Sequence, residues 1–172
     1  MVGEASGPSS QEKERYYTMK KKKSSFNPST IRCCYCGSSV TLRSAEGIVP
    51  DAKPGTMLYV CRNYPRCDSY VKVHPGTKLP MGSLANKELR TLRRKAHYHF
   101  DQLYETGFMS RVDAYEWLSA VLGLPMGKTH IGQLGPYYCQ QVIDESKKLL
   151  HAQKGRINRS VQHQRRKEAR AS

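Results

Sequence analysis

Long hydrophobic runs are missing from this 172-residue chain. No stretch approaches the roughly 20 apolar residues that a transmembrane helix requires. The amino-terminal segment, MVGEASGPSSQEKERYYTMKKKK, also lacks the apolar centre of a secretory signal. We therefore expect no membrane partner and a cytoplasmic location. In a reducing cytosol the six cysteines are not expected to form a disulfide framework, and metal binding becomes their favoured role.

Acidic residues are scarce. There are 14 Asp and Glu against 29 Lys and Arg, which gives a formal net charge of +15 and a pI of about 9.7. Such an imbalance is typical of proteins that bind a polyanion. We therefore favour a nucleic acid as partner, the alternative being that the cations only confer solubility. The cations gather in four lysines at 20–23 and, near the other end, in Arg156, Arg159, Arg165, Arg166, Lys167 and Arg170.

Catalytic motifs are missing as well. The chain shows no set of nucleophile, base and orienting group and no paired carboxylates. The stretch GLPMGKTH contains Gly-Lys-Thr but lacks the earlier glycine and the preceding strand of a phosphate-binding loop. Asp101, Asp113 and Glu116 are scattered over predicted helices. The sequence therefore predicts a protein that is not an enzyme, and a nuclease ranks last among the alternatives.

The chain divides into four predicted segments with an α+β fold. Residues 1–29 are polar and predict a disordered basic arm, and residues 154–172 predict a basic, disordered tail. Between them, residues 30–76 predict a small antiparallel ribbon with strands at VTLRS, MLYVC and YVKVH. Residues 77–153 predict a three-helix domain, because the apolar spacing there changes to three and four.

Local signals place the ends of the three helices. Ser83 is the expected N-cap of the first helix, and Ser110 with Asp113 resembles a capping box at the start of the second. Gly123 is expected to end the second helix. Pro136 suits the first turn of the third.

The cysteines show metal-ligand spacing. Cys33 and Cys36 form C-x2-C followed by Gly37, and Cys61 and Cys67 form C-x5-C. Two thiolate pairs of this kind suit a tetrahedral zinc site. Four thiolates leave no open coordination position, so the pattern predicts one structural Zn²⁺ that supports folding.

Three further residues have side chains that can bind zinc. Cys34 is expected outside the zinc shell, because pairing with Cys36 gives the poorer C-x-C turn. Cys139 lies on the apolar stripe of the third helix and is expected to be buried. His74 stays open as an alternative ligand.

The stretches CCYCGSSVTLR and YVCRNYPRCDSYVKV resemble the C4 zinc ribbons at the carboxyl end of bacterial topoisomerase I, which bind single-stranded DNA. The resemblance covers roughly residues 31–73 and implies zinc binding by the same four cysteines. Nothing resembles the catalytic domain, so strand breakage does not transfer. Residues 31–150 are also similar to a family of small zinc-finger proteins of bacteria and their phages. That similarity implies that ribbon and helices form one unit and that the protein lies in the bacterial cytosol or nucleoid.

Aromatic and cationic residues around the second cysteine pair suggest how a nucleic acid would bind. Tyrosines beside arginines form a stacking surface for unpaired bases, worth about 1–3 kcal/mol per base, although tyrosines also fill a thin core. Arginines at three- and four-residue spacing form a basic ridge on a helix, or an ordinary solvated face. Single-stranded DNA is the favoured ligand, with RNA next. The predicted contact residues are Tyr59, Arg62, Tyr64, Arg66, Tyr70, Lys72, Arg90, Arg93 and Arg94.

The main alternative belongs to another class, a protein-interaction adaptor. It would be a phage or mobile-element factor that docks on host replication or transcription machinery. An exposed apolar patch around Tyr115, Trp117 and Leu118 would favour it.

Overall fold

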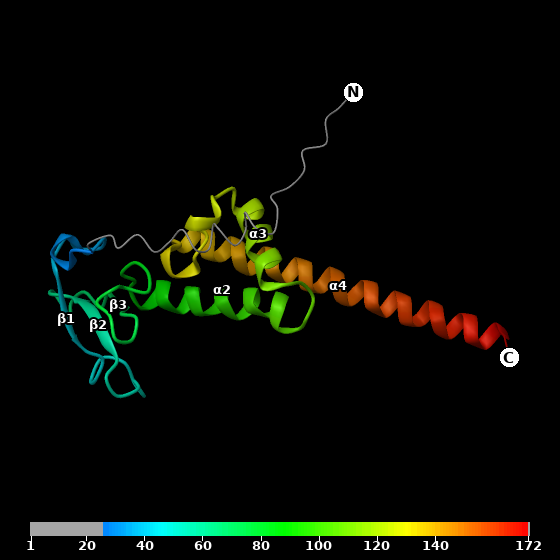
Figure 1. Ribbon diagram of the computed structural model, residues 1–172, viewed down its shortest axis with the longest axis horizontal. Coiled ribbons are helices and arrows are strands. Elements are labelled where there is room, and N and C mark those ends of the chain that lie inside the picture. The colour runs from blue at the N-terminus through cyan, green and yellow to red at the C-terminus, as the bar shows by residue number, and fades with distance from the viewer. Residues whose placement is uncertain (1–25, 172) are drawn as a thin grey trace, which may run out of the picture.

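The computed structural model describes residues 26–171. The predicted basic arm, with its lysines at 20–23, lies outside the described residues apart from its last four positions. The zinc ribbon occupies one end of the molecule and the helices follow it (Figure 1). The ribbon consists of a three-stranded antiparallel sheet with β1 (Val40–Ser44), β2 (Met57–Cys61) and β3 (Tyr70–Lys72). The predicted α+β class and the three strands are confirmed.

Strand β2 is the middle strand of the sheet. Val40 of β1 pairs with Cys61, and Lys72 of β3 pairs with Leu58. The four residues from Leu58 to Cys61 are all buried. Because successive side chains point to opposite faces, β2 contributes to a different small hydrophobic cluster on each side. One cluster contains Cys33, Tyr59, Cys61, Val71, Val73 and Leu84, and the other contains Ala45, Leu58 and Val60.

Helix α2 (Lys87–Glu105) begins later than expected. The predicted N-cap, Ser83, was wrong, and the cap is Asn86, whose Oδ1 accepts a hydrogen bond from Leu89 N at 2.9 Å. The reason is tertiary pairing. Ala85 N donates to Tyr70 O and Tyr70 N donates to Ala85 O, both at 3.1 Å. This bridge extends the chain beside β3 and delays the helix.

Helix α3 (Arg111–Leu122) has the predicted ends. Ser110 Oγ accepts from Asp113 N at 3.1 Å. The chain leaves the helix at Gly123, which has a left-handed φ of 61°. The cap and the glycine thus act at the positions that the sequence indicates.

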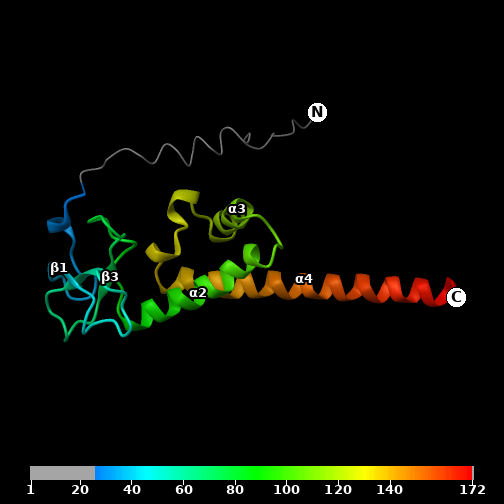
Figure 2. The same cartoon turned by 60° about the horizontal axis from the view of Figure 1, so that its bottom comes forward.

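Helix α4 (Pro136–Ala171) starts at the predicted proline but is much longer than predicted. The segment 154–172, expected as a disordered tail, is helical through Ala171. The sequence from 154 to 171 contains no proline and a single glycine, Gly155, so nothing in it forces the helix to stop. Figures 1 and 2 both show the second half of α4 extending beyond the other helices.

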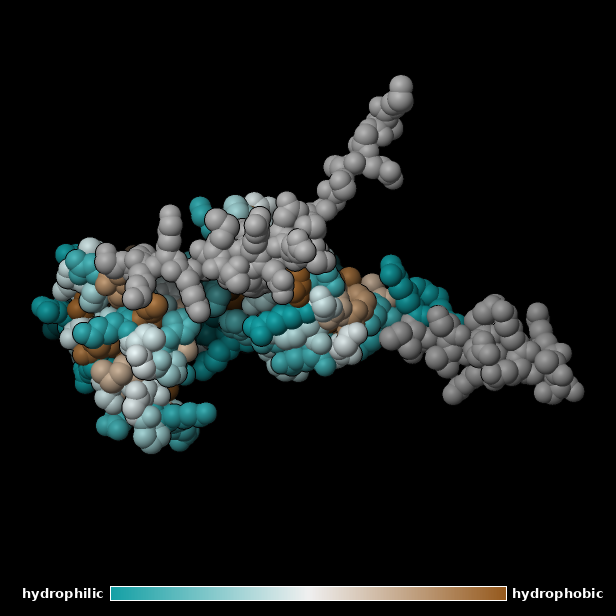
Figure 3. Space-filling model, viewed as in Figure 1, coloured by the Kyte–Doolittle hydropathy of each residue, from teal (hydrophilic) through white to brown (hydrophobic). Residues whose placement is uncertain are grey.

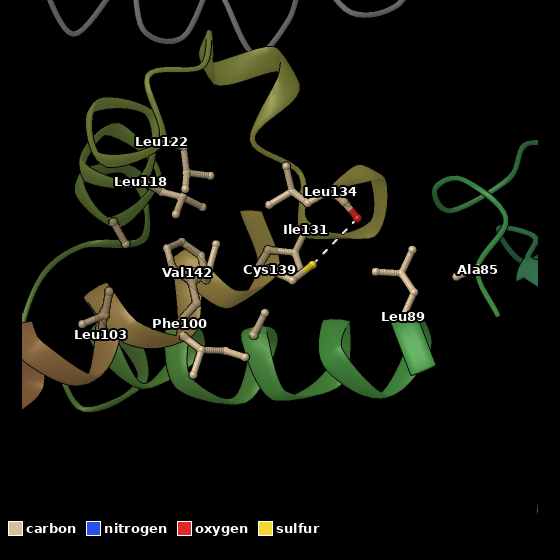
Figure 4. Close-up of a cluster of buried hydrophobic side chains, with 13 residues drawn as sticks. Ala85, Leu89, Phe100, Leu103, Leu118, Leu122, Ile131, Leu134, Cys139 and Val142 are labelled. Carbon is tan, nitrogen blue, oxygen red and sulfur yellow. Dashed lines mark hydrogen bonds between the residues drawn. The ribbon is translucent and has the colours of Figure 1, made fainter. Parts of the chain in front are cut away.

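The main core lies where α2, α3 and α4 meet. Phe100 and Leu103 of α2, Leu118 of α3 and Val142 of α4 are fully buried and point toward one another (Figure 4). Ile131, from a short 3-10 turn, is also fully buried there. No helix in the described part of the chain is long and apolar enough to cross a bilayer.

The residues that would have marked an adaptor surface belong to this core. Leu118 has no exposed surface, and Tyr115 and Trp117 are half-buried against the core cluster. Tyr115 also makes an edge contact with Phe100, with ring centroids 5.0 Å apart. On the face seen in Figure 3, brown hydrophobic areas are small and separated by hydrophilic ones. The patch expected for an adaptor is therefore packing surface of the helical domain.

Candidate metal centre

The four predicted cysteines meet at one point beside the sheet. The sulfurs of Cys33, Cys36, Cys61 and Cys67 all lie within 4.8 Å of one another. Two pairs are closer, Cys33 to Cys67 at 3.5 Å and Cys36 to Cys61 at 3.3 Å. Zinc–sulfur bonds of about 2.3 Å in a tetrahedron place sulfurs about 3.8 Å apart. The donor set and its spacing fit one structural zinc ion, as the sequence predicts.

The first pair of ligands is held by a tight turn. Gly37 N donates to Cys33 O at 2.9 Å, and Cys33 N donates to Ser38 O at 2.8 Å. Gly37 has a φ of 71°, a conformation that residues with a Cβ rarely adopt. Within the turn, the backbone groups of Tyr35 and Cys36 hydrogen-bond to the Cys33 sulfur. The glycine after the second cysteine is therefore part of the metal-binding turn.

The second pair brackets a longer loop that starts at the end of β2. Tyr64 N donates to Cys61 O and Cys67 N donates to Asn63 O, both at 3.0 Å. These bonds fold the five intervening residues back so that both sulfurs face the same side. Arg62 N donates to Ser39 O at 3.0 Å and ties this loop to the first turn.

Serines support the sulfurs from outside the shell. Ser69 is fully buried, and its Oγ lies 3.0 Å from the sulfur of Cys33 and 3.3 Å from that of Cys67. Hydrogen bonds from Ser38 lower the pKa of Cys36 to about 6, whereas burial raises the pKa of Cys61 to about 12. Zinc is bound by thiolates, so metal binding favours the deprotonated form of all four cysteines.

The other candidate ligands lie apart from this cluster. Cys34 is exposed, and neither Cys34 nor His74 belongs to the metal-binding group. Cys139 is buried in the helical core, where its Sγ donates a weak bond to Leu134 O at 3.8 Å (Figure 4). Cys34 outside the shell and Cys139 in the core agree with the predictions, and the alternative for His74 is not supported.

Both cysteine turns reach the start of α2. From the first, the Tyr35 hydroxyl accepts from Asn86 N at 3.2 Å. From the second, Asp68 Oδ2 accepts from Lys87 N at 2.8 Å. The carboxylate lies at the positive end of the helix dipole, where it is stabilising. The metal-binding turns are thus anchored directly to the helical domain.

The predicted tyrosines are mostly occupied by the fold. Tyr59 is buried, and its hydroxyl donates to Lys78 O at 2.9 Å. Tyr70 is covered by the Arg90 guanidinium, whose Cζ lies 3.8 Å from the ring centroid. Tyr64 is half-buried beside the cluster of Ala45, Leu58 and Val60. Tyr59 therefore fills the thin ribbon core and does not offer a surface for stacking.

The expected basic ridge on α2 is also different in the structure. Arg93 is only 9% exposed and donates to Leu134 O and to both oxygens of Ser83. Arg90 is half-buried and forms an ion pair with Asp68. Arg90 donates to Asp68 O and Ala85 O, and Arg93 donates to Ser83 O and Leu134 O, so these arginines connect segments. Of the three ridge residues, only Arg94 is exposed.

The exposed cations fall beside two surface pockets. Arg62 lines one of about 370 Å³ along β1, together with Arg32 and Lys78. Lys72 and Arg94 line another of about 360 Å³ between the ribbon and α2. Arg66 is exposed on the second cysteine loop and lines neither.

Three residues at the centre were missed from the sequence: Tyr35, Asp68 and Ser69. The signal for Ser69 was its place two residues after a zinc ligand. The partners of Tyr35 and Asp68 lie 51 and 19 residues away. No local pattern could have indicated those contacts.

Comparison with known proteins treats the ribbon and the helices together. Neither the curated proteins nor the solved structures gave a significant match, so the likeness to the topoisomerase ribbon stays a prediction. A family model for a zinc-finger-containing domain matches residues 29–149, which include all four zinc ligands and most of the helical core. The chain therefore belongs to the DUF3268 family of zinc-finger-containing domains.

Proposed function

We propose that this zinc protein binds single-stranded nucleic acid, with DNA favoured over RNA, and that it does so without catalysis. The observation that carries the proposal is the pocket along β1. Its wall contains Arg32, Arg62 and Lys78 and no acidic residue. Three cations around one groove attract a phosphate backbone.

The surroundings of this pocket suit a strand that is not fully paired. Leu42, which lines it, is 37% exposed, and Tyr35 on the neighbouring cysteine turn is 44% exposed. Exposed apolar and aromatic side chains next to cations offer a surface for unpaired bases. Tyr35 takes the stacking role that the sequence assigned to the buried Tyr59.

The non-catalytic part of the proposal rests on the metal centre. Four thiolates complete the tetrahedral shell of zinc, so no position is open for water or substrate. The zinc ion then stabilises the folded ribbon, and the folded ribbon positions the basic side chains that bind the nucleic acid. We place this activity in a reducing cellular compartment, where thiolates remain available to the metal.

The test is a salt titration of binding. Full-length, zinc-loaded protein is titrated with matched single-stranded DNA, duplex DNA and single-stranded RNA, and affinity is measured by fluorescence anisotropy at several salt concentrations. We expect the single strands to bind more tightly than the duplex, with DNA ahead of RNA. Replacing Arg32 and Arg62 together with alanine should lower single-strand affinity about tenfold.

The matched control replaces two exposed lysines that line neither described pocket, Lys95 and Lys147. Its affinity should stay within about twofold of the unaltered protein. Equal and weak binding of all three nucleic acids, lost together as salt rises, would contradict the proposal. So would equal losses in the groove variant and the control.

A further inference from the structure

The second pocket lies where the ribbon meets the helical domain. It has a volume of about 360 Å³ and is bordered by β3, the linker after it, the start of α2 and the loop around residue 132. Met81, which is 36% exposed, gives it an apolar side, whereas the ring of Tyr70 is covered by Arg90. Arg93 lies on its inner side and Lys72 on its ribbon side. One site thus combines hydrophobic surface with positive charge from two parts of the fold.

Arg93 is a buried charge without an acidic partner. Its guanidinium donates to Leu134 O at 2.9 and 3.0 Å and to Ser83 O at 2.9 Å, which are neutral acceptors. No carboxylate in the described residues lies within ion-pair distance of it. A buried charge that is hydrogen-bonded but not neutralised is costly. An anion in the adjoining pocket would offset that cost.

The rim of the pocket carries more positive charge. Lys72 and Arg94 are exposed, and Arg94 Nη2 donates only to a neutral group, Thr91 Oγ1, at 3.1 Å. His97 and His130 also line the pocket, and no Asp or Glu does. Two of the lining residues have acidic partners outside the lining, since Asp68 pairs with Arg90 and Asp101 Oδ1 lies 3.9 Å from His97 Nδ1, whereas Arg93, Lys72 and Arg94 have none among the described ion pairs. The pocket is therefore lined by cations and is open to an anionic group.

On the side of the pocket formed by the linker and the loop around residue 132, the two backbones are in direct contact. Ser83 N donates to Gly132 O at 3.0 Å. A Cβ at Gly82 would collide with that same carbonyl, so glycine allows the linker and the loop to touch. This contact holds Ser83 in place to accept from Arg93, and it sets the shape of the pocket without charged side chains.

We propose that this junction pocket binds the phosphate group of a nucleotide, with the base against the exposed apolar side chain of Met81. The phosphate lies near Arg93, with Lys72 and Arg94 closing over it. The phosphate belongs either to a nucleic-acid strand or to a free nucleotide. The first source rests on the proposed function, and the second does not.

The experiment uses full-length, zinc-loaded, isotope-labelled protein and follows backbone amide resonances by NMR. The probes are inorganic phosphate, thymidine monophosphate, and a decathymidylate with hydroxyl ends. We expect each probe to shift Gly82, Ser83 and Gly132. Alanine at both Lys72 and Arg94 should weaken binding of thymidine monophosphate about tenfold. The control, alanine at the exposed Arg43 of β1 and Lys95 of α2, should bind as the unaltered protein does.

The outcomes separate this inference from the proposed function. If neither phosphate nor the mononucleotide shifts the pocket resonances, the pocket proposal is wrong. If decathymidylate binds equally well to the Lys72 and Arg94 variant while thymidine monophosphate binds it less tightly, the pocket takes a free nucleotide and lies outside the strand-binding surface, and the proposed function stands. If the mononucleotide binds here and decathymidylate does not bind at all, the pocket stands as a free-nucleotide site and the proposed function falls.

Discussion

Asp68 Oδ2 lies 3.0 Å from Arg90 Nη2, and this ion pair joins the zinc ribbon to the first helix of the core. Asp68 directly follows the zinc ligand Cys67, and the same carboxylate oxygen accepts from Lys87 N at 2.8 Å. Arg90 in turn donates to Asp68 O at 2.7 Å and covers Tyr70. The position of the metal loop therefore sets the position of the helix start.

Loss of one zinc ligand should remove the metal. Serine at Cys61 should lower zinc from one equivalent toward none and unfold the ribbon, because three thiolates and a buried hydroxyl hold zinc poorly. Metal analysis and circular dichroism measure the effect. Cys34→Ser is the matched control and should retain a full equivalent. Loss of zinc in the control would show that Cys34 is a ligand.

Removal of zinc should loosen the start of α2 and leave the helical core intact. A chelator is added to the full-length protein, and amide hydrogen exchange is followed by residue. Protection should fall in the ribbon and at residues 86–90, because the contacts of Tyr35 and Asp68 depend on the cysteine turns. Phe100 and Val142 lie in the separate core and should keep their protection. Uniform loss throughout would show that ribbon and core unfold together.

Ser69 should tune the metal centre without holding it. Ser69→Ala removes the hydroxyl that lies near the sulfurs of Cys33 and Cys67. We expect zinc affinity about 10-fold to 100-fold lower, measured by competition with a chelating dye. Ser44→Ala, at the opposite end of the sheet, serves as the control and should change affinity little. Equal affinities for the two variants would remove Ser69 from the metal centre.

Arg93 should contribute strongly to stability although it belongs to no ion pair. Arg93→Ala leaves Ser83 O without its donor and Leu134 O with only the weak bond from Cys139, and we expect a loss of about 3 kcal/mol in the free energy of unfolding. Urea denaturation measures it. The neighbouring Arg94→Ala changes an exposed side chain, so its effect should remain within about 0.5 kcal/mol. Similar values for both would mean that the buried bonds of Arg93 are worth little.

Truncation after residue 150 should weaken nucleic-acid binding and flatten its salt dependence. The deleted segment contains Lys154, Arg156, Arg159 and four further cations at 165, 166, 167 and 170. Each cation that neutralises a phosphate adds to the slope of log affinity against log salt by about 0.7 on a single strand. Core packing extends to Leu149 and Leu150, so the truncated chain keeps its core. An unchanged slope would show that the segment makes no phosphate contacts.

The local features of the fold could be predicted from the sequence because each depends on near neighbours. The three strands have alternating or continuous apolar residues between turn signals, and Ser110 caps the backbone only three residues away. The cysteine spacing indicated the zinc ligands for the same reason, since the first pair lies within one turn and the second pair within one short loop. Asn86 as the helix cap was missed because pairing between Ala85 and Tyr70 overrides the local signal of Ser83.

The surface was harder to predict because burial depends on partners distant in sequence. Arg93 and Arg94 are neighbours with the same side chain, yet one is buried and the other exposed. The partner that decides this, Leu134 O, lies 41 residues away. Tyr59 likewise has the sequence context of a stacking residue, but its place in the middle strand buries it. The sequence shows that a side chain is charged, but it does not show whether the folded chain leaves that side chain exposed to a ligand.

The length of α4 has a geometric consequence. Its 36 residues, at about 1.5 Å per residue, make a rod of about 54 Å. The part beyond the core carries cations away from the zinc ribbon along one direction (Figure 1). Two binding surfaces on a rigid spacer act together only on a partner that spans both. If the ribbon and the end of α4 both contact a strand, as we propose, affinity should rise in a step, and not gradually, once an oligonucleotide is long enough to reach both.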